Sequence, residues 1–126
     1  MNSFVLDSSA ILAVLNREKG SETAQTFFAD GIVSSVNLAE ILTKLTEQGH
    51  NRSTAMESFN LLQLSVIDFD VPQARKAAEL RPLTRHLGLS LGDRSCLALA
   101  ILHSSTAVTA DKDWRGLSFC PIEVIR

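Results

Sequence analysis

Short apolar runs that alternate with helical patterns constrain this chain more than any other feature of its sequence. A strand that is buried on both faces reads as a continuous apolar run, and strands separated by helices tend to pair in parallel. The alternation therefore predicts an α/β fold in which helices cover both faces of a parallel sheet. Five runs fit this interpretation: residues 4–6, 32–34, 66–69, 107–110 and 122–125.

Helical patterns fill most of the chain between these runs. Ser35 or Asn37 is expected to cap a long helix, and Thr54-x-x-Glu57 has the capping-box spacing of the next helix start. Residues 82–92 read as a loop because they contain one proline and two glycines. The sequence predicts helices over residues 10–16, 23–29 and 93–103. It also predicts one helix that ends near residue 47 and two helices that start near residues 54 and 70. In the helix that starts near 70, the expected face of small residues contains Ala74, Ala77, Ala78 and Leu80.

The length and charge of the chain limit its class. We expect a single domain over residues 1–126. A net charge of -2 gives no general basic surface, so any nucleic acid must be held by local cations. Cys96 and Cys120 lack C-x-x-C spacing and are interpreted as reduced thiols of a cytoplasmic protein. No signal peptide is expected at the start, and the apolar runs are too short for a membrane span.

Asp93 occupies an unusual position, where a turn passes into an apolar helix. Residues 88–100 contain two glycines and Ser90 before this acid and an almost continuous apolar stretch after it. A carboxylate at the start of a buried helix costs free energy unless something nearby compensates it. Ser90-x-x-Asp93 has capping-box spacing, so backbone N–H groups are one compensation. A cation shared with other acids is the alternative.

Three more acids are expected at the same edge of the sheet. Asp7 ends the first strand, Asp111 ends the fourth, and Glu40 lies early in the helix after the second strand. Ligands of parallel α/β sheets bind outside the carboxyl ends of the strands. Four carboxylates gathered there repel one another unless a divalent cation lies between them, and oxygen ligands favour Mg²⁺ or Mn²⁺. Such a site can activate water for attack at phosphate.

Each of these acids also has an ordinary structural interpretation. Asp93 could cap its own helix, and Asp7 could be the N-cap of the helix that follows it. Glu40 precedes Lys44 by four residues and lies opposite the apolar stripe of its helix, which favours a solvated surface pair. Asp111 could be a turn residue. Their common location at one expected edge of the sheet favours a shared site.

Hydroxyl groups and cations flank the acids. Ser9 and Thr109 could orient Asp7 and Asp111, or they could cap backbone groups. Trp114 is expected to pack against the core rather than to stack on a base, and the three histidines show no ligand spacing. Three cations could contact phosphate or could screen the acids: Arg94, Lys112 and Arg115.

Four segments together resemble the PIN-domain ribonucleases of the VapC type, which are the toxin halves of bacterial toxin–antitoxin pairs. The segments are FVLDSSA at 4–10, SVNLAEIL at 35–42, GLSLGDRSCLALA at 88–100 and VTADKDW at 108–114. The third is the most specific, and the resemblance covers nearly the whole chain. It implies a three-layer α/β/α sandwich with a central parallel sheet of four to five strands.

The resemblance also implies a function and its residues. It implies a metal-dependent endoribonuclease that uses Mg²⁺, or Mn²⁺, at an acidic quartet. The matching positions are Asp7, Glu40, Asp93 and Asp111, with Asp113 as an alternative to the last. The hydroxyl residue of the family near the first acid matches Ser9 or Ser8, and the one before the last acid matches Thr109. A homodimer and inhibition by an antitoxin protein are further implications.

Two other hypotheses remain open from the sequence. A phosphatase or phosphotransferase could use Asp7 as a nucleophile, because a strand that ends in Asp suits this chemistry. The chain has no second Asp two residues later to act as general acid. A non-catalytic binding module, in which the acids only cap helices, is the other hypothesis.

Overall fold

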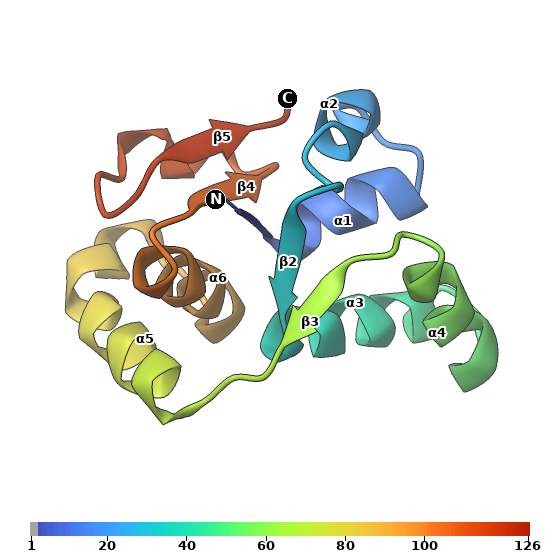
Figure 1. Cartoon of the computed structure of the whole chain (residues 1–126), viewed down its shortest axis with the longest axis horizontal. Coiled ribbons are helices and arrows are strands. Elements are labelled where there is room, and N and C mark those ends of the chain that lie inside the picture. The colour runs from blue at the N-terminus through green and yellow to red at the C-terminus, as the bar shows by residue number, and fades with distance from the viewer. Residues whose placement is uncertain (1–2) are drawn as a thin grey trace.

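A five-stranded, entirely parallel sheet forms the centre of the molecule in the computed structural model, which describes residues 3–126. Its strand order is β3-β2-β1-β4-β5. This arrangement confirms the predicted α/β fold with a central parallel sheet (Figure 1). The strands are β1 (Phe4–Leu6), β2 (Gly31–Ser34), β3 (Ser65–Ile67), β4 (Thr106–Thr109) and β5 (Ile122–Val124).

Helices cover both faces of the sheet. The chain moves outward from β1 through β2 to β3, returns to β4 on the other side of β1, and ends at β5. Because parallel crossovers are right-handed, this reversal of direction puts the helices that follow β3 on the opposite face from the earlier ones. The first face carries α1 (Ser8–Leu15), α2 (Ser21–Gln25), α3 (Ser35–Glu47) and α4 (Arg52–Asn60), and the second carries α5 (Val71–Thr84) and α6 (Leu91–Leu102) (Figure 1).

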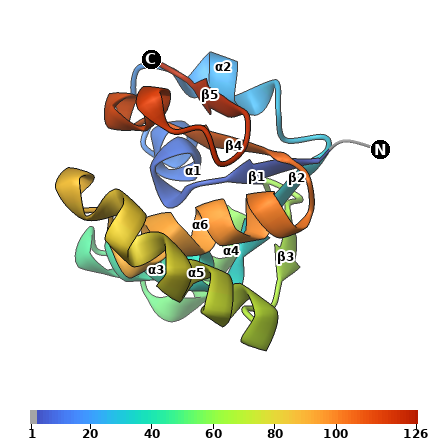
Figure 2. The same cartoon turned by 90° about the vertical axis from the view of Figure 1, so that its left-hand side faces the viewer.

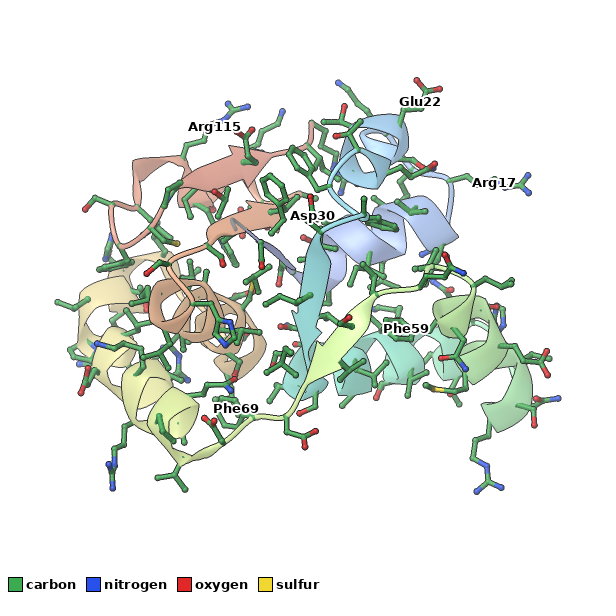
Figure 3. The ribbon with its side chains drawn as sticks, in the orientation of Figure 1. Arg17, Glu22, Asp30, Phe59, Phe69 and Arg115 are labelled. Atoms are coloured by element: carbon green, nitrogen blue, oxygen red, sulfur yellow. The ribbon has the colours of Figure 1, made fainter. Side chains whose placement is uncertain are left out.

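Two apolar clusters fill the spaces on either side of the sheet. Successive side chains of a strand point to opposite faces, so Leu6 of β1 joins the cluster under α1–α4 while Val5 joins the cluster under α5 and α6. Phe59 of α4 is buried in the first cluster, and Phe69, between β3 and α5, packs against the second (Figure 3). Trp114 is fully buried in the second cluster, which confirms the expected core position.

The strand order fixes where a ligand site is expected. The chain leaves β1 toward one side of the sheet and later enters β4 on the other side, so the switch point lies between these two strands. Phe4 of β1 pairs with Gly31 of β2 and with Thr106 of β4. In Figure 2, β1 runs from the amino terminus at the right toward α1 at the left. The carboxyl ends of β1 and β4 thus adjoin each other.

Several helix ends differ from the sequence predictions. Ser34 caps α3 in place of Ser35 or Asn37, since its side chain accepts a hydrogen bond from the Val36 N–H. Asn51, rather than Thr54, caps α4. Both errors arose because several adjacent polar residues can cap, and the tertiary fold selects which of them lies outside the helix.

The expected loop over residues 82–92 is wrong in its first half. Helix α5 continues through Pro82 to Thr84, and the short 3₁₀ helix η1 (Arg85–Leu87) follows it. The buried face of α5 consists of Gln73, Ala77, Leu80 and Thr84, whereas Ala74 and Ala78 are exposed. Small side chains were a poor guide to this face because alanine is tolerated both in the core and at the surface of helices.

The remaining general predictions have different outcomes. Cys96 is buried and Cys120 half-buried, and both are free thiols. Among residues 3–126, no helix combines the length and the apolar character that crossing a membrane requires. The prediction about the start of the chain includes Met1 and Asn2, which lie outside the described residues. The single domain over residues 1–126 stays a prediction.

Candidate functional site

Asp7 lies at the switch point of the sheet, directly after the central strand. Its backbone N–H donates to the Val108 carbonyl of β4 at 2.8 Å, and its side chain is only 3% exposed. The residue precedes α1, but its carboxylate makes no capping hydrogen bond to that helix. Asp7 therefore occupies the N-cap position of α1, as one interpretation of the sequence expected, but it caps the helix through its backbone carbonyl and not through its carboxylate.

Two hydroxyl groups hold the Asp7 carboxylate by the same oxygen. Ser9 donates to Oδ2 at 2.6 Å, and Thr109 donates to Oδ2 at 3.1 Å. The two hydroxyl oxygens in turn accept backbone N–H groups of the turn after β4: Ser9 from Ala110 at 2.9 Å and Thr109 from Asp111 at 3.1 Å. Both interpretations of Ser9 and Thr109 are therefore correct, because each hydroxyl orients the Asp7 carboxylate and also accepts a backbone N–H group.

The other oxygen of Asp7 is buried without a partner. Within the described residues, Asp7 Oδ1 accepts no hydrogen bond. The pKa of Asp7 is raised from 3.8 to about 7, chiefly because the carboxyl group is buried; the Ser9 and Thr109 hydroxyls lower this pKa, and the nearby charges of Asp93 and Glu40 raise it. A bound cation would reduce the free-energy cost of keeping this buried carboxylate charged.

Glu40 faces the space between α1 and α6. Its Oε1 accepts from the Ser8 hydroxyl at 2.9 Å and from the Asn37 amide at 2.8 Å, and the residue is half-buried. The alternative of a solvated pair with Lys44 is wrong, because Lys44 Nζ lies 4.0 Å from Glu47 instead. The helix surface opposite the apolar stripe of α3 is partly covered by neighbouring elements, which the periodicity of one helix cannot reveal.

Asn37 and Gly92 belong to this region and were missed as site residues. Asn37 is fully buried, and its amide donates both to Glu40 Oε1 and to the Gly92 carbonyl at 3.1 Å. A Cβ atom on Gly92 would overlap the Glu40 carboxylate, so glycine at this position leaves room for the Glu40 side chain beside α6. The sequence held one usable signal, since Asn37 shares the buried face of α3 with Ile41 and Leu45.

Asp93 caps its helix, as the spacing predicted. Ser90 Oγ accepts from the Asp93 N–H at 3.2 Å, and Asp93 Oδ2 accepts from the Ser90 N–H at 2.9 Å. This reciprocal pair is a capping box. Capping does not remove the acid from the region, because its charge contributes to the raised pKa of Asp7.

Asp111, which follows β4, also makes a capping hydrogen bond while it lies near the candidate site. Its Oδ1 accepts from the Asp113 N–H at 2.9 Å at the start of the 3₁₀ helix η2 (Lys112–Gly116). Asp111 is half-buried next to Thr109, whereas Asp113 is exposed. The turn interpretation of Asp111 is correct, and it leaves Asp111 closer than Asp113 to the hydroxyls that contact Asp7.

The three flanking cations do not surround the acids. Arg94 donates to the Ala77 carbonyl of α5 at 3.0 Å, so its guanidinium is directed to the neighbouring helix. Lys112 and Arg115 are exposed on η2, and Figure 3 shows Arg115 extending outward from the molecule. His86 and His103 are exposed as expected, and His50 is half-buried.

The oxygens left over suit a hard divalent cation. Within residues 3–126, the side-chain hydrogen bonds occupy one oxygen of each of the four acids. The second oxygen of each remains available, and all-oxygen ligand sets are those that Mg²⁺ and Mn²⁺ prefer. No three Asp, Glu, His or Cys side chains of the described residues converge closely enough to form a preassembled metal site. Their shared coordination of a cation would require Asp93 and Asp111 to turn toward Asp7.

The fold is that of a parallel α/β protein with the buried carboxylate of Asp7 at its topological switch point. The model of the PIN domain family matches residues 4–119, and the chain belongs to this family. This match confirms the resemblance drawn from the four sequence segments. A comparison with curated protein sequences gives no match.

Solved structures of similar fold include three toxin–antitoxin proteins. VapBC2 from Rickettsia felis, bound to a promoter DNA fragment, has a TM-score of 0.76 and 18% identity, and the similarity covers 98% of each chain. DNA-bound VapBC from Salmonella typhimurium has a TM-score of 0.76 and 19% identity, over 100% of each chain. VapC20 from Mycobacterium tuberculosis, described as a Sarcin-Ricin loop cleaving toxin, has a TM-score of 0.73 and 19% identity over 94% of this chain and 99% of that chain. At these identities the likeness concerns the fold.

The raised pKa of Asp7 predicts a pH dependence of stability. Asp7 binds its proton more tightly in the folded state, so its stabilising contribution is complete below about pH 4 and is lost as the pH rises through about 7. The neutral Asp7→Asn variant lacks this loss. Without divalent metal, we expect the free energy of unfolding of wild type to fall relative to Asp7→Asn between these pH values, by about 1.4 kcal/mol per pH unit at most.

Urea unfolding in a chelating buffer at several pH values measures this difference. Asp113→Asn is the matched control, since Asp113 is exposed. If wild type and Asp7→Asn showed the same pH dependence, the buried, proton-retaining state of Asp7 would be refuted.

Proposed function

We propose that this protein is a metal-dependent endoribonuclease that acts as the toxin of a toxin–antitoxin pair. The observation that carries the proposal is the buried, unpartnered Oδ1 of Asp7, at the switch point of a PIN-domain sheet and within the influence of Asp93 and Glu40. Asp7 is the N-cap residue of α1, but its carboxylate makes no capping hydrogen bond, so helix capping gives no reason for this carboxylate to be buried there.

Asp7, Asp93 and Asp111 are the residues that we propose to hold Mg²⁺ or Mn²⁺, with Glu40 and Asp113 as further candidates. When bound, such an ion activates water and neutralises charge that develops on phosphate. Ser9 and Thr109 fix the orientation of the Asp7 carboxylate by binding Oδ2, which leaves Oδ1 for the ion. Ser8 and Asn37 hold Glu40 by Oε1, so its Oε2 is free to position the attacking water.

The comparisons support the biological context. The PIN-domain match supports a nuclease with a divalent metal, and the described activity of VapC20 supports RNA as the substrate. The VapBC complexes and the toxin–antitoxin complex from Klebsiella pneumoniae support a cognate antitoxin as partner. A homodimer and a cytoplasmic location complete the proposal.

A thermal melt separates this proposal from a non-catalytic binding module. An ion that binds only the folded protein raises its melting temperature by mass action. We expect added Mg²⁺ to raise the melting temperature of wild type and to leave that of Asp7→Asn nearly unchanged. No shift in wild type would favour the binding module. A phosphoaspartyl intermediate at Asp7 would instead support the phosphatase hypothesis.

RNA cleavage with Mg²⁺ tests the proposal directly. We expect wild type to cleave RNA internally, and we expect Asp7→Asn and Asp93→Asn each to reduce the rate by at least about 100-fold, because each removes a proposed charged ligand. Sequencing of the fragments locates the cuts. Equal cleavage by wild type and both variants, at matched purity and fold, would refute the assignment.

We predict that the substitution Gly92→Ala reduces activity without reducing stability. The new methyl group would displace the Glu40 carboxylate, a flexible side-chain end, while alanine is the better helix residue by about 1 kcal/mol. We expect a free energy of unfolding equal to that of wild type or higher, with RNA cleavage reduced about 10- to 100-fold.

Gly116→Ala is the matched control for this substitution. A Cβ atom at Gly116 meets nothing within 4 Å. We therefore expect this variant to keep both stability and cleavage. Full activity of Gly92→Ala would show that the position of Glu40 does not matter for cleavage.

A further inference from the structure

We propose that the hollow between α1 and α3 binds the phosphodiester backbone of single-stranded RNA, with Lys44 as its principal cation. This inference rests on the proposed function and extends it to the path of the substrate. It assigns a role to a lysine for which the sequence suggested only a surface pair with Glu40.

The hollow begins at the candidate site and leads away from it along α3. Its volume is about 350 Å³. Ser9, which contacts Asp7, is one of its lining residues, so the hollow starts at the hydroxyl that orients the buried acid. The remaining lining residues are Leu12, Asn16, Glu18, Lys44, Gln48 and Arg126.

The lining is rich in hydrogen-bond donors that suit phosphate. Lys44 supplies positive charge, and the amides of Asn16 and Gln48 supply neutral donors. The one acid of the lining, Glu18, is already engaged by Arg126 at 3.0 Å. The same guanidinium nitrogen also donates to the Lys19 carbonyl at 3.1 Å, and these two contacts hold the guanidinium in the wall of the hollow.

Lys44 also lines a second hollow on the other side of Glu40. That hollow has a volume of about 480 Å³, and its lining includes Leu91, Gly92 and the two acids Glu40 and Glu47. Lys44 therefore lies one helical turn from Glu40 and lines both hollows, and Glu40 lines the second of them. An RNA strand that crosses the acids would pass within reach of the ammonium group from either side.

The ammonium group of Lys44 is available for such a contact. Its side chain is 55% exposed, and its nearest acid oxygen, on Glu47, is 4.0 Å away. The chain needs local cations of this kind because its net charge is -2 and Arg94 is engaged by the Ala77 carbonyl. Affinity for the phosphate backbone of nucleic acids depends mainly on such neutralising cations.

Binding measurements without cleavage test this inference. The background is Asp7→Asn in a chelating buffer, and the probe is a short fluorescein-labelled single-stranded RNA followed by fluorescence anisotropy. We expect Lys44→Gln to weaken binding roughly fivefold, as for loss of an exposed charge contact. We also expect it to reduce the slope of log affinity against log salt by about 0.7, the value for one phosphate contact on a single strand. Lys44→Arg should bind as tightly as the background protein.

Lys76→Gln is the matched control. Lys76 pairs with Glu79 three residues later, as Lys44 does with Glu47, but it lies on α5 over the opposite face of the sheet. This variant should keep the affinity and the salt slope.

The remaining outcomes distinguish the proposed phosphate-binding hollow from the proposed nuclease function. Equal effects of Lys44→Gln and Lys76→Gln, or no binding of RNA by the background protein, would overturn the phosphate-binding hollow even if wild type cleaves RNA. A specific loss in Lys44→Gln would support the hollow even if wild type failed to cleave.

Discussion

The burial of the Asp7 carboxylate at the end of the central strand is the constraint on which the rest of the site depends. Burial of a charged group is costly, and the structure compensates only one of its oxygens, through Ser9 and Thr109. The same two hydroxyls bind the backbone of the turn after β4. The connection between α1 and β4 is thus built around an acid that is left half-satisfied, and its pKa is raised to about 7 as a result.

The close approach of α6 to α3 fixes the position of Glu40. Gly92 lets the two helices meet at the Glu40 carboxylate, and the buried amide of Asn37 links Glu40 to the Gly92 carbonyl. The position of the Glu40 carboxylate therefore depends on the lack of a side chain at Gly92 and on the hydrogen bond from the buried Asn37 amide. Neither residue carries charge, which is why attention to acidic residues alone overlooks both.

Stabilising and functional interpretations of an acid need not exclude each other in this fold. Asp93 completes a capping box and also acts on the pKa of Asp7, and Asp111 begins η2 while it lies beside Thr109. A capping bond uses one carboxylate oxygen and leaves the second. Acids at helix starts and strand ends can therefore contribute to local stability and still be available to a ligand at the same edge of the sheet.

The order of strands and helices, the parallel sheet and the capping box at Ser90 and Asp93 could all be predicted from the sequence. They could be predicted because apolar periodicity and short-range hydrogen bonding are local properties of the chain. The location of all four acids at one edge stays a prediction, made because parallel strands end together. Only the tertiary structure decided that Glu40 is half-buried, that Arg94 turns to α5, and that Asn37 holds Glu40. Those features depend on which side chains of separate helices meet, and no spacing along the chain encodes that contact.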